Sequence, residues 1–208
     1  MKKVKENKDL KKRAFQQIEK MHHHKMFLFV SLFGSTLIFL FMLIAFATAP
    51  LEIRESPDFR IPKAFAISTI VLLLSSGTIS RILPLFAIGE LRAVLKWMGI
   101  TLFLGLLFAL CQFIGWQELS RGNVFFDGKN SGAYLYVISG LHLIHVVAGI
   151  SYLIYLLLNC YNADKDGVKK LVYETNPYQK IKFEMLRDLW LFTSFIWLLL
   201  FLYFFMAY

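Results

Sequence analysis

A stretch of 30 residues from Ser131 to Cys160 contains no Asp, Glu, Lys or Arg, and it limits the possible folds more than any other feature. As an α-helix this stretch is about 45 Å long, whereas the hydrocarbon core of a bilayer is about 30 Å thick. The helix is therefore long enough to cross a membrane and to extend beyond it. We predict a membrane-spanning helix at residues 131–160.

Four further apolar runs have lengths close to the roughly 17 to 25 residues that a spanning helix needs. These runs are too long and too close together for a soluble core in a chain of 208 residues, of which 57% are hydrophobic. The sequence therefore predicts an all-α integral membrane protein, a bundle of five transmembrane helices. The approximate spans are 26–51, 64–83, 97–117, 131–160 and 189–208. A cleaved signal peptide at residues 1–49 is the disfavoured alternative, because its apolar run is longer than such peptides carry.

Lys and Arg residues are concentrated on one side of the predicted membrane. Residues 1–25 hold 9 of them, residues 81–96 hold 3 and residues 164–188 hold 6, whereas loops 52–63 and 118–129 hold 3 and 2. By the positive-inside rule, residues 1–25 are a basic cytoplasmic tail, and residues 26–208 form a transmembrane domain whose C-terminus is periplasmic. The net charge of +9 then reflects a tail beside anionic lipid, with no nucleic acid as partner. We expect a multi-pass membrane protein.

The loops between the predicted spans are short. Turn formers stand at Ser56-Pro57-Asp58 and at Asp127-Gly128 in the two outer loops. The longest loop, residues 163–188, carries charges of both signs, and we expect it to form an interfacial segment or to extend the flanking helices. Cys111 and Cys160 are expected near opposite faces of the membrane, beyond the reach of a disulfide.

His142 and His145 lie near the middle of the 131–160 helix, three residues apart and hence on one face, which Gly149 continues. Paired intramembrane histidines can hold a b-type heme, but one heme iron needs axial ligands from two sides, which neighbours on one helix cannot supply. We expect a neutral pair hydrogen-bonded within a helix interface, because an unpartnered polar group in lipid is costly. A b-type cytochrome or quinone-reactive membrane protein that uses both histidines is the alternative. For the run from His22 to His24, a solvated tail is favoured over adventitious metal binding.

No Asp or Glu lies in the middle of any predicted span, so the sequence contains no pathway of buried carboxylates for protons. This absence argues against a small membrane transporter, the second alternative. Hydroxyl and amide side chains such as Ser75, Ser76, Gln112 and Ser139 are expected to form hydrogen bonds between helices, and Gly140 to allow close helix contact. The chain shows no catalytic or metal-binding constellation, so a subunit is favoured over a solitary enzyme.

The segment Tyr134 to Val146 reads YLYVISGLHLIHV and resembles the signature of subunit III of heme-copper oxidases. The fourth of that family's five core helices has an aromatic residue, then Ser or Thr with Gly, then Leu-His-x-x-His-Val and a nearby Gly. Segments Leu72–Thr78 and Leu102–Leu119 and the start of the last helix are similar to other parts of the family pattern. The residues that carry the resemblance are Ser75, Ser76, Gln112, Trp116, Glu118, Ser139, Gly140, His142, His145, Gly149 and Trp190.

The chain departs from the family pattern at two positions. The first core helix of the family commonly carries Ser-Glu, whereas Leu32 follows Ser31 here. The last helix of the family is commonly entered through Trp-His-Phe, whereas Glu184 stands at the best-matching position for the His. The missing Glu calls into question any role that the family assigns to it, and the missing His weakens the match at the last helix.

The resemblance implies a non-catalytic accessory subunit of a proton-pumping terminal oxidase, an oxidoreductase complex that reduces oxygen to water. It implies that subunit I is the main partner, with subunit II nearby, and that heme and copper are held by partner subunits and not by this chain. It also implies bound phospholipid, together with support of stability and of proton uptake at the cytoplasmic face. Another subunit decides between cytochrome c and quinol as electron donor, and we expect cytochrome c.

Overall fold

The computed structural model describes residues 2–48, 62–122 and 132–207, and in these ranges all regular structure is helical. The helices are α1 (Lys2–Ala47), α3 (Lys63–Ser80), α4 (Ile82–Ala87), α5 (Leu91–Arg121), α6 (Gly132–Asp164), α7 (Gly167–Thr175) and α8 (Pro177–Ala207). Five candidate membrane spans are found among the described residues, at His24–Ala47, Lys63–Ala87, Leu91–Arg121, Ala133–Asp164 and Pro177–Met206. The predicted fold class, a bundle of five apolar helices, is therefore confirmed.

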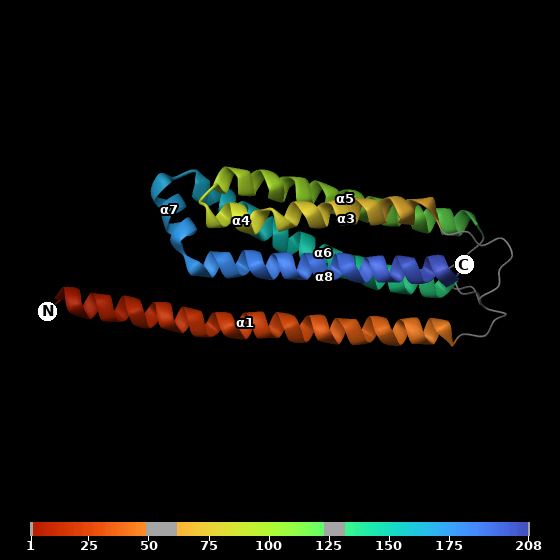
Figure 1. Cartoon of the computed structure of the whole chain (residues 1–208), viewed down its shortest axis with the longest axis horizontal. Coiled ribbons are helices and arrows are strands. Elements are labelled where there is room, and N and C mark those ends of the chain that lie inside the picture. The colour runs from red at the N-terminus through yellow and green to blue at the C-terminus, as the bar shows by residue number, and fades with distance from the viewer. Residues whose placement is uncertain (1, 49–61, 123–131, 208) are drawn as a thin grey trace.

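The long helices run side by side, with α3, α5, α6 and α8 forming a compact group and α1 lying at its edge beside α8 (Figure 1). The short helix α7 closes one end of the bundle, and the N-terminal part of α1 extends past that end. The N- and C-termini lie at opposite ends, as an odd number of crossings requires. Which end faces the cytoplasm stays a prediction from the Lys and Arg distribution.

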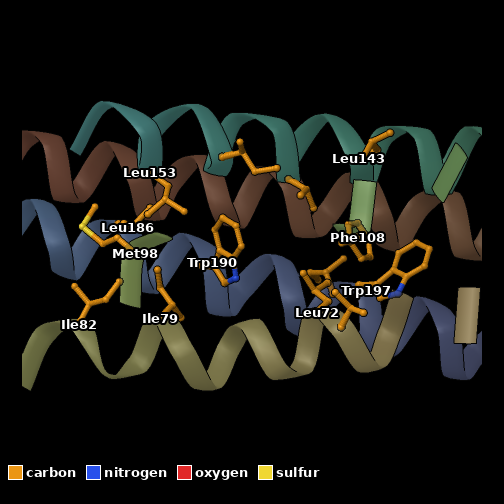
Figure 2. Packing of buried hydrophobic residues seen from close by; sticks show 14 of the residues in the cluster. Leu72, Ile79, Ile82, Met98, Phe108, Leu143, Leu153, Leu186, Trp190 and Trp197 are labelled. Carbon is orange, nitrogen blue, oxygen red and sulfur yellow. The ribbon is translucent and has the colours of Figure 1, made fainter. Parts of the chain in front are cut away.

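Aromatic side chains fill the centre of the bundle. Trp190 and Trp197 of α8 both point into the space between α3, α5 and α6, where Phe108 packs beside them (Figure 2). The ring of Trp197 meets those of Phe65 and Phe108 edge to face, with centroids 5.7 and 5.3 Å apart. Such contacts fix the depth of α8 against α3 and α5.

Three spans extend well beyond their sequence prediction, and one of them is the third, which covers Leu91–Arg121 against the predicted 97–117. The second continues beyond residue 83, because α4 follows α3 directly after Arg81 and carries the span to Ala87. The last helix begins at Pro177, well before the predicted start at residue 189. A helix can extend past the apolar run when its charged side chains reach water or find partners.

In the segment 163–188, α8 extends the last span towards α7, which agrees with the expected extension of a flanking helix. The short helix α7 lies between α6 and α8, and its position in the membrane interface stays a prediction. Asp166 caps α7 by accepting a hydrogen bond from the Val168 backbone N–H at 3.0 Å. The Asn176 side chain accepts one from the Tyr178 N–H at 2.9 Å, where α8 begins. Gly89, with φ of 76°, makes the turn between α4 and α5 in a conformation that favours glycine.

The N-terminal segment is helical from Lys2 and continuous with the first span, so the predicted tail and membrane helix form one element. Cys111 and Cys160 are both free and buried. The predicted turns at Ser56-Pro57-Asp58 and Asp127-Gly128 lie outside the described residues.

Candidate functional site

His142 is fully buried and links α6 to α8. Its Nε2 donates a hydrogen bond to the Thr193 carbonyl oxygen at 2.9 Å. In a neutral imidazole this leaves Nδ1 as an acceptor, and no partner for it is found within the described part of the chain. The ring is enclosed by Trp197 and Phe108, with centroids 4.8 and 5.7 Å away. The ring therefore lies in a fully buried aromatic environment.

His145, one turn further along α6, is half-buried and bonds in a different direction. Its Nδ1 lies 2.8 Å from the Leu141 carbonyl oxygen, which can only accept, so the proton is on Nδ1. Nε2 then accepts a hydrogen bond from the Ser35 hydroxyl of α1 at 2.6 Å. The two histidines of the family motif thus join α6 to two different helices, α8 and α1.

Trp190 lies where four helices come close together. Its indole Nε1 donates to the Ser75 hydroxyl of α3 at 3.0 Å. A Cβ atom added at Gly105 of α5 would lie 2.8 Å from Trp190 Cη2, and one added at Gly149 of α6 would lie 3.4 Å from Cε3. Only glycine leaves room for the indole on α5, so Gly105 is as much a part of this contact as the predicted Ser75 and Gly149.

A third set of contacts joins α5 to α6 and α3. Trp116 Nε1 donates to the Ser139 hydroxyl at 2.9 Å, and Ser139 in turn donates to the Leu135 carbonyl oxygen at 2.5 Å. Gly140 adjoins the same indole, since an added Cβ there would be 3.8 Å from Trp116 Cζ2. Gln112 is buried and donates through Nε2 to the Ser68 hydroxyl at 3.0 Å.

Two residues of the motif remain outside these contacts. Ser76 donates at 3.1 Å to the Leu72 carbonyl oxygen of its own helix. Glu118 is half-buried near the end of α5, and its backbone carbonyl accepts from the Gly122 N–H. For neither side chain is a hydrogen bond to another described helix found.

Several participants were not singled out from the sequence. Ser35 is the partner of His145, Ser68 is the partner of Gln112, and Thr69 accepts from Trp197 Nε1 at 3.0 Å. The spacing of Ser68 and Ser75, seven residues apart, places both on one face of α3 and is the available signal. For Ser35 the sequence gives no comparable signal, because its role depends on α1 packing against α6.

The edge between α1 and the other helices has an ion pair and a cleft. Lys25 Nζ lies 3.0 Å from Glu184 Oε2 at one end of the bundle. Beside this pair a cleft of about 360 Å³ opens between α1, α6 and α8. Its walls are mainly apolar and aromatic, and they include Phe27, Leu28, Tyr152 and Met185.

The buried polar groups therefore act as connections between helices. Apart from the unpartnered Nδ1 of His142 and Oε1 of Gln112, the buried motif side chains are hydrogen-bonded to backbone or to hydroxyls of neighbouring helices. In the described ranges no group of three or more His, Cys, Asp or Glu residues is arranged to hold a metal ion. The hydrogen bonds of the buried polar side chains specify how the helices pack and align.

Comparison with known proteins gives a consistent result. Residues 16–208 match the family model of cytochrome c oxidase subunit III. The "Probable cytochrome c oxidase subunit 3" proteins of Mycobacterium bovis and Mycobacterium tuberculosis are 27% identical over 133 residues, 64% of this chain and 61% of theirs. The "Cytochrome bo(3) ubiquinol oxidase subunit 3" of Buchnera aphidicola is 30% identical over 139 residues, 65% of this chain and 64% of its own.

The chain thus spans less than two thirds of the length of these relatives. The family match, however, extends over the whole helical bundle and includes every residue of the histidine, tryptophan and glycine contacts described above. The chain belongs to the cytochrome c oxidase subunit III family.

Proposed function

We propose that this chain is a non-catalytic accessory subunit of a proton-pumping heme-copper terminal oxidase. The observation that carries the proposal is the family match over residues 16–208. The inward hydrogen bonds of His142, His145 and Trp190 support it, because they give these motif residues a structural role. The subunit packs on subunit I, with subunit II nearby, and the heme and copper that carry out oxygen reduction belong to those partners.

The membrane orientation is part of the same proposal. The end of the bundle with α7 and the N-terminus faces the cytoplasm, and the C-terminus faces the periplasm of a bacterial inner membrane. The support is the excess of Lys and Arg in residues 1–25 and 164–188. The relatives named above are all bacterial, which agrees with this location.

The cleft beside α1 holds phospholipid in this proposal. Phe27, Leu28 and Met185 line this cleft and offer apolar surface of the kind that acyl chains contact. Lipid in this position fills the space between α1 and the other helices. It would thereby stabilise the attachment of α1, which supports the stability of the whole complex.

Support of proton uptake is proposed for the cytoplasmic end. Several carboxylates lie there in ion pairs, among them Asp164 with Arg92 and Lys170, Glu174 with Lys170, and Glu184 with Lys25. Carboxylates at a membrane surface can bind and release protons on the way to a partner's proton channel. The pairs keep these groups at fixed positions near the membrane boundary.

Purification of the tagged chain from its native membranes tests the proposal. After mild detergent extraction, we expect it to co-purify with a protein that shows heme bands in a reduced-minus-oxidised spectrum and contains copper. The chain purified alone is expected to show no heme absorption. Stoichiometric heme on the isolated chain that disappears on replacing His142 and His145 would instead establish the b-type cytochrome alternative.

A further inference from the structure

A second cavity, of about 480 Å³, lies at the α7 end of the bundle. It is formed by the last turns of α6, by α7 and by the first turns of α8. The candidate span Ala133–Asp164 ends at this boundary, and the span Pro177–Met206 begins there. The side chains used below are Lys169, Tyr173, Gln179 and Lys182, all of which line it. The cavity is separate from the cleft beside α1, although both share Tyr155 and Lys182 as a wall.

Two polar groups of this cavity wall are buried without a hydrogen-bond partner among the described residues, the Tyr173 hydroxyl and Gln179 Oε1. Tyr173 is only 9% exposed, and its ring is held edge to face against Phe86. Burial raises the pKa of Tyr173, so the hydroxyl stays protonated and needs an acceptor. Gln179 Oε1 needs a donor. A ligand that satisfies both must carry an acceptor and a donor.

The charge of the cavity wall is positive. Lys182 Nζ lies 4.5 Å from the ring centre of Tyr178 and 5.6 Å from that of Tyr155, and it has no ion pair with a described carboxylate. Lys169 is 3.8 Å from Asp166, but both side chains are largely exposed, so this pair is weak. No Asp or Glu is among the described residues that line the cavity. An anion with several acceptor oxygens therefore fits best.

The outer rim of the cavity is apolar. On α7, Val168, Leu171 and Val172 are 74%, 63% and 61% exposed, and Val168 and Val172 line the cavity. A short helix with apolar side chains exposed beside lysines is typical of a segment that lies in the membrane interface. A soluble anion would make no use of this apolar rim, whereas a lipid covers it with its glycerol and upper acyl chain.

We infer that this cavity binds the headgroup of an anionic phospholipid. Lys169, Lys182 and the Tyr173 hydroxyl hold the phosphate, a hydroxyl of the headgroup donates to Gln179 Oε1, and Val168 and Val172 contact the acyl region. The site requires only that the chain is in a membrane, so it does not depend on the oxidase partnership proposed above. Its occupation would hold α7 against the ends of α6 and α8.

Lipid titration of the full-length chain in detergent tests this inference. Native mass spectrometry counts the bound lipids and gives the dissociation constant for phosphatidylglycerol and for phosphatidylcholine. Phosphatidylglycerol is expected to bind more tightly. We expect Lys169→Gln to weaken this binding about fivefold, the contribution of one lysine near a lipid phosphate. Tyr173→Phe, which keeps the ring, is expected to weaken it about tenfold through loss of a hydrogen bond to a charged group.

Lys169 and Tyr173 line this cavity and not the cleft beside α1, so these two variants report on the headgroup site alone. Lys180→Gln is the matched control, because Lys180 is an exposed lysine of α8 outside the cavity lining. An equal loss in Lys180→Gln would overturn the inference in favour of general charge attraction. Equal binding of phosphatidylcholine by the unmodified chain would also overturn it, independently of any variant. Displacement of phosphatidylglycerol by millimolar inorganic phosphate would assign the cavity to a free anion instead.

Discussion

Replacing Gly105 by alanine probes a close contact between α5 and α8. The new methyl carbon would lie 2.8 Å from Cη2 and 3.2 Å from Cζ2 of Trp190. Real Cβ atoms do not approach an aromatic carbon so closely, so α5 and α8 must separate or the indole must rotate. Rotation would break the 3.0 Å hydrogen bond from Trp190 Nε1 to the Ser75 hydroxyl.

The expected cost follows from three contributions. Overpacking of a filled core costs about 1 to 3 kcal/mol, and loss of the hydrogen bond to Ser75 adds about 1 kcal/mol. The higher helix propensity of alanine offsets up to about 1 kcal/mol. We therefore expect Gly105→Ala to lower the free energy of unfolding by about 1 to 3 kcal/mol.

Equilibrium unfolding of the purified full-length chain by increasing SDS in mixed micelles measures this change, with tryptophan fluorescence as the signal. Gly77→Ala in α3 is the matched control, since a Cβ added at Gly77 meets no atom within 4 Å. The control is expected to be neutral or stabilised by less than about 1 kcal/mol. If Gly105→Ala unfolds at the same SDS fraction as Gly77→Ala, the close contact with Trp190 does not exist as described.

Three further variants test the other connections. His142→Leu removes the donor to the Thr193 carbonyl and should destabilise the chain by about 1 to 3 kcal/mol, measured as reduced yield of assembled complex; full yield with abolished turnover would contradict a packing role. Ser35→Ala leaves His145 Nε2 without its donor, at about 1 kcal/mol, and should raise hydrogen exchange in α1 but not in α5; unchanged exchange in α1 would contradict this. Lys25→Glu should weaken the attachment of α1, and Glu184→Lys in the same chain should restore it; double-variant stability no better than that of Lys25→Glu would refute the ion pair.

The fold class could be predicted because a spanning helix has a length and a composition that the sequence displays directly. The ends of the helices could not, and α8 is the clearest case. Residues 177–188 carry five charged side chains, Lys180, Lys182, Glu184, Arg187 and Asp188, so hydropathy ends the span at residue 189. The helix nevertheless begins at Pro177. Glu184 in this segment pairs with Lys25 of α1, a partner that belongs to the tertiary structure and that hydropathy does not show.

The same limit applies to the candidate site. Spacing alone places His142 and His145 on one face of one helix, yet it does not reveal that they bond to α8 and α1 respectively. Likewise, the sequence marks Gly149 and Trp190 as parts of a motif but does not pair them. Their pairing depends on the relative depth of α6 and α8, which the packing of large aromatic rings sets.

The attachment of α1 brings the two departures from the family pattern together. Lys25, Leu32, Phe39 and Phe46 follow one another at intervals of seven residues and so lie along one face of α1. Phe39 and Phe46 on that face are buried, and Lys25 at its other end pairs with Glu184. Only 17% of the most apolar part of α1 is buried inside the molecule, against 39% for α8, so α1 depends on few contacts. Both departures lie along this face of α1. Leu32 stands in the middle of the face and carries no carboxylate. Glu184 of α8 places a carboxylate beside Lys25, which lies two helical turns from Leu32.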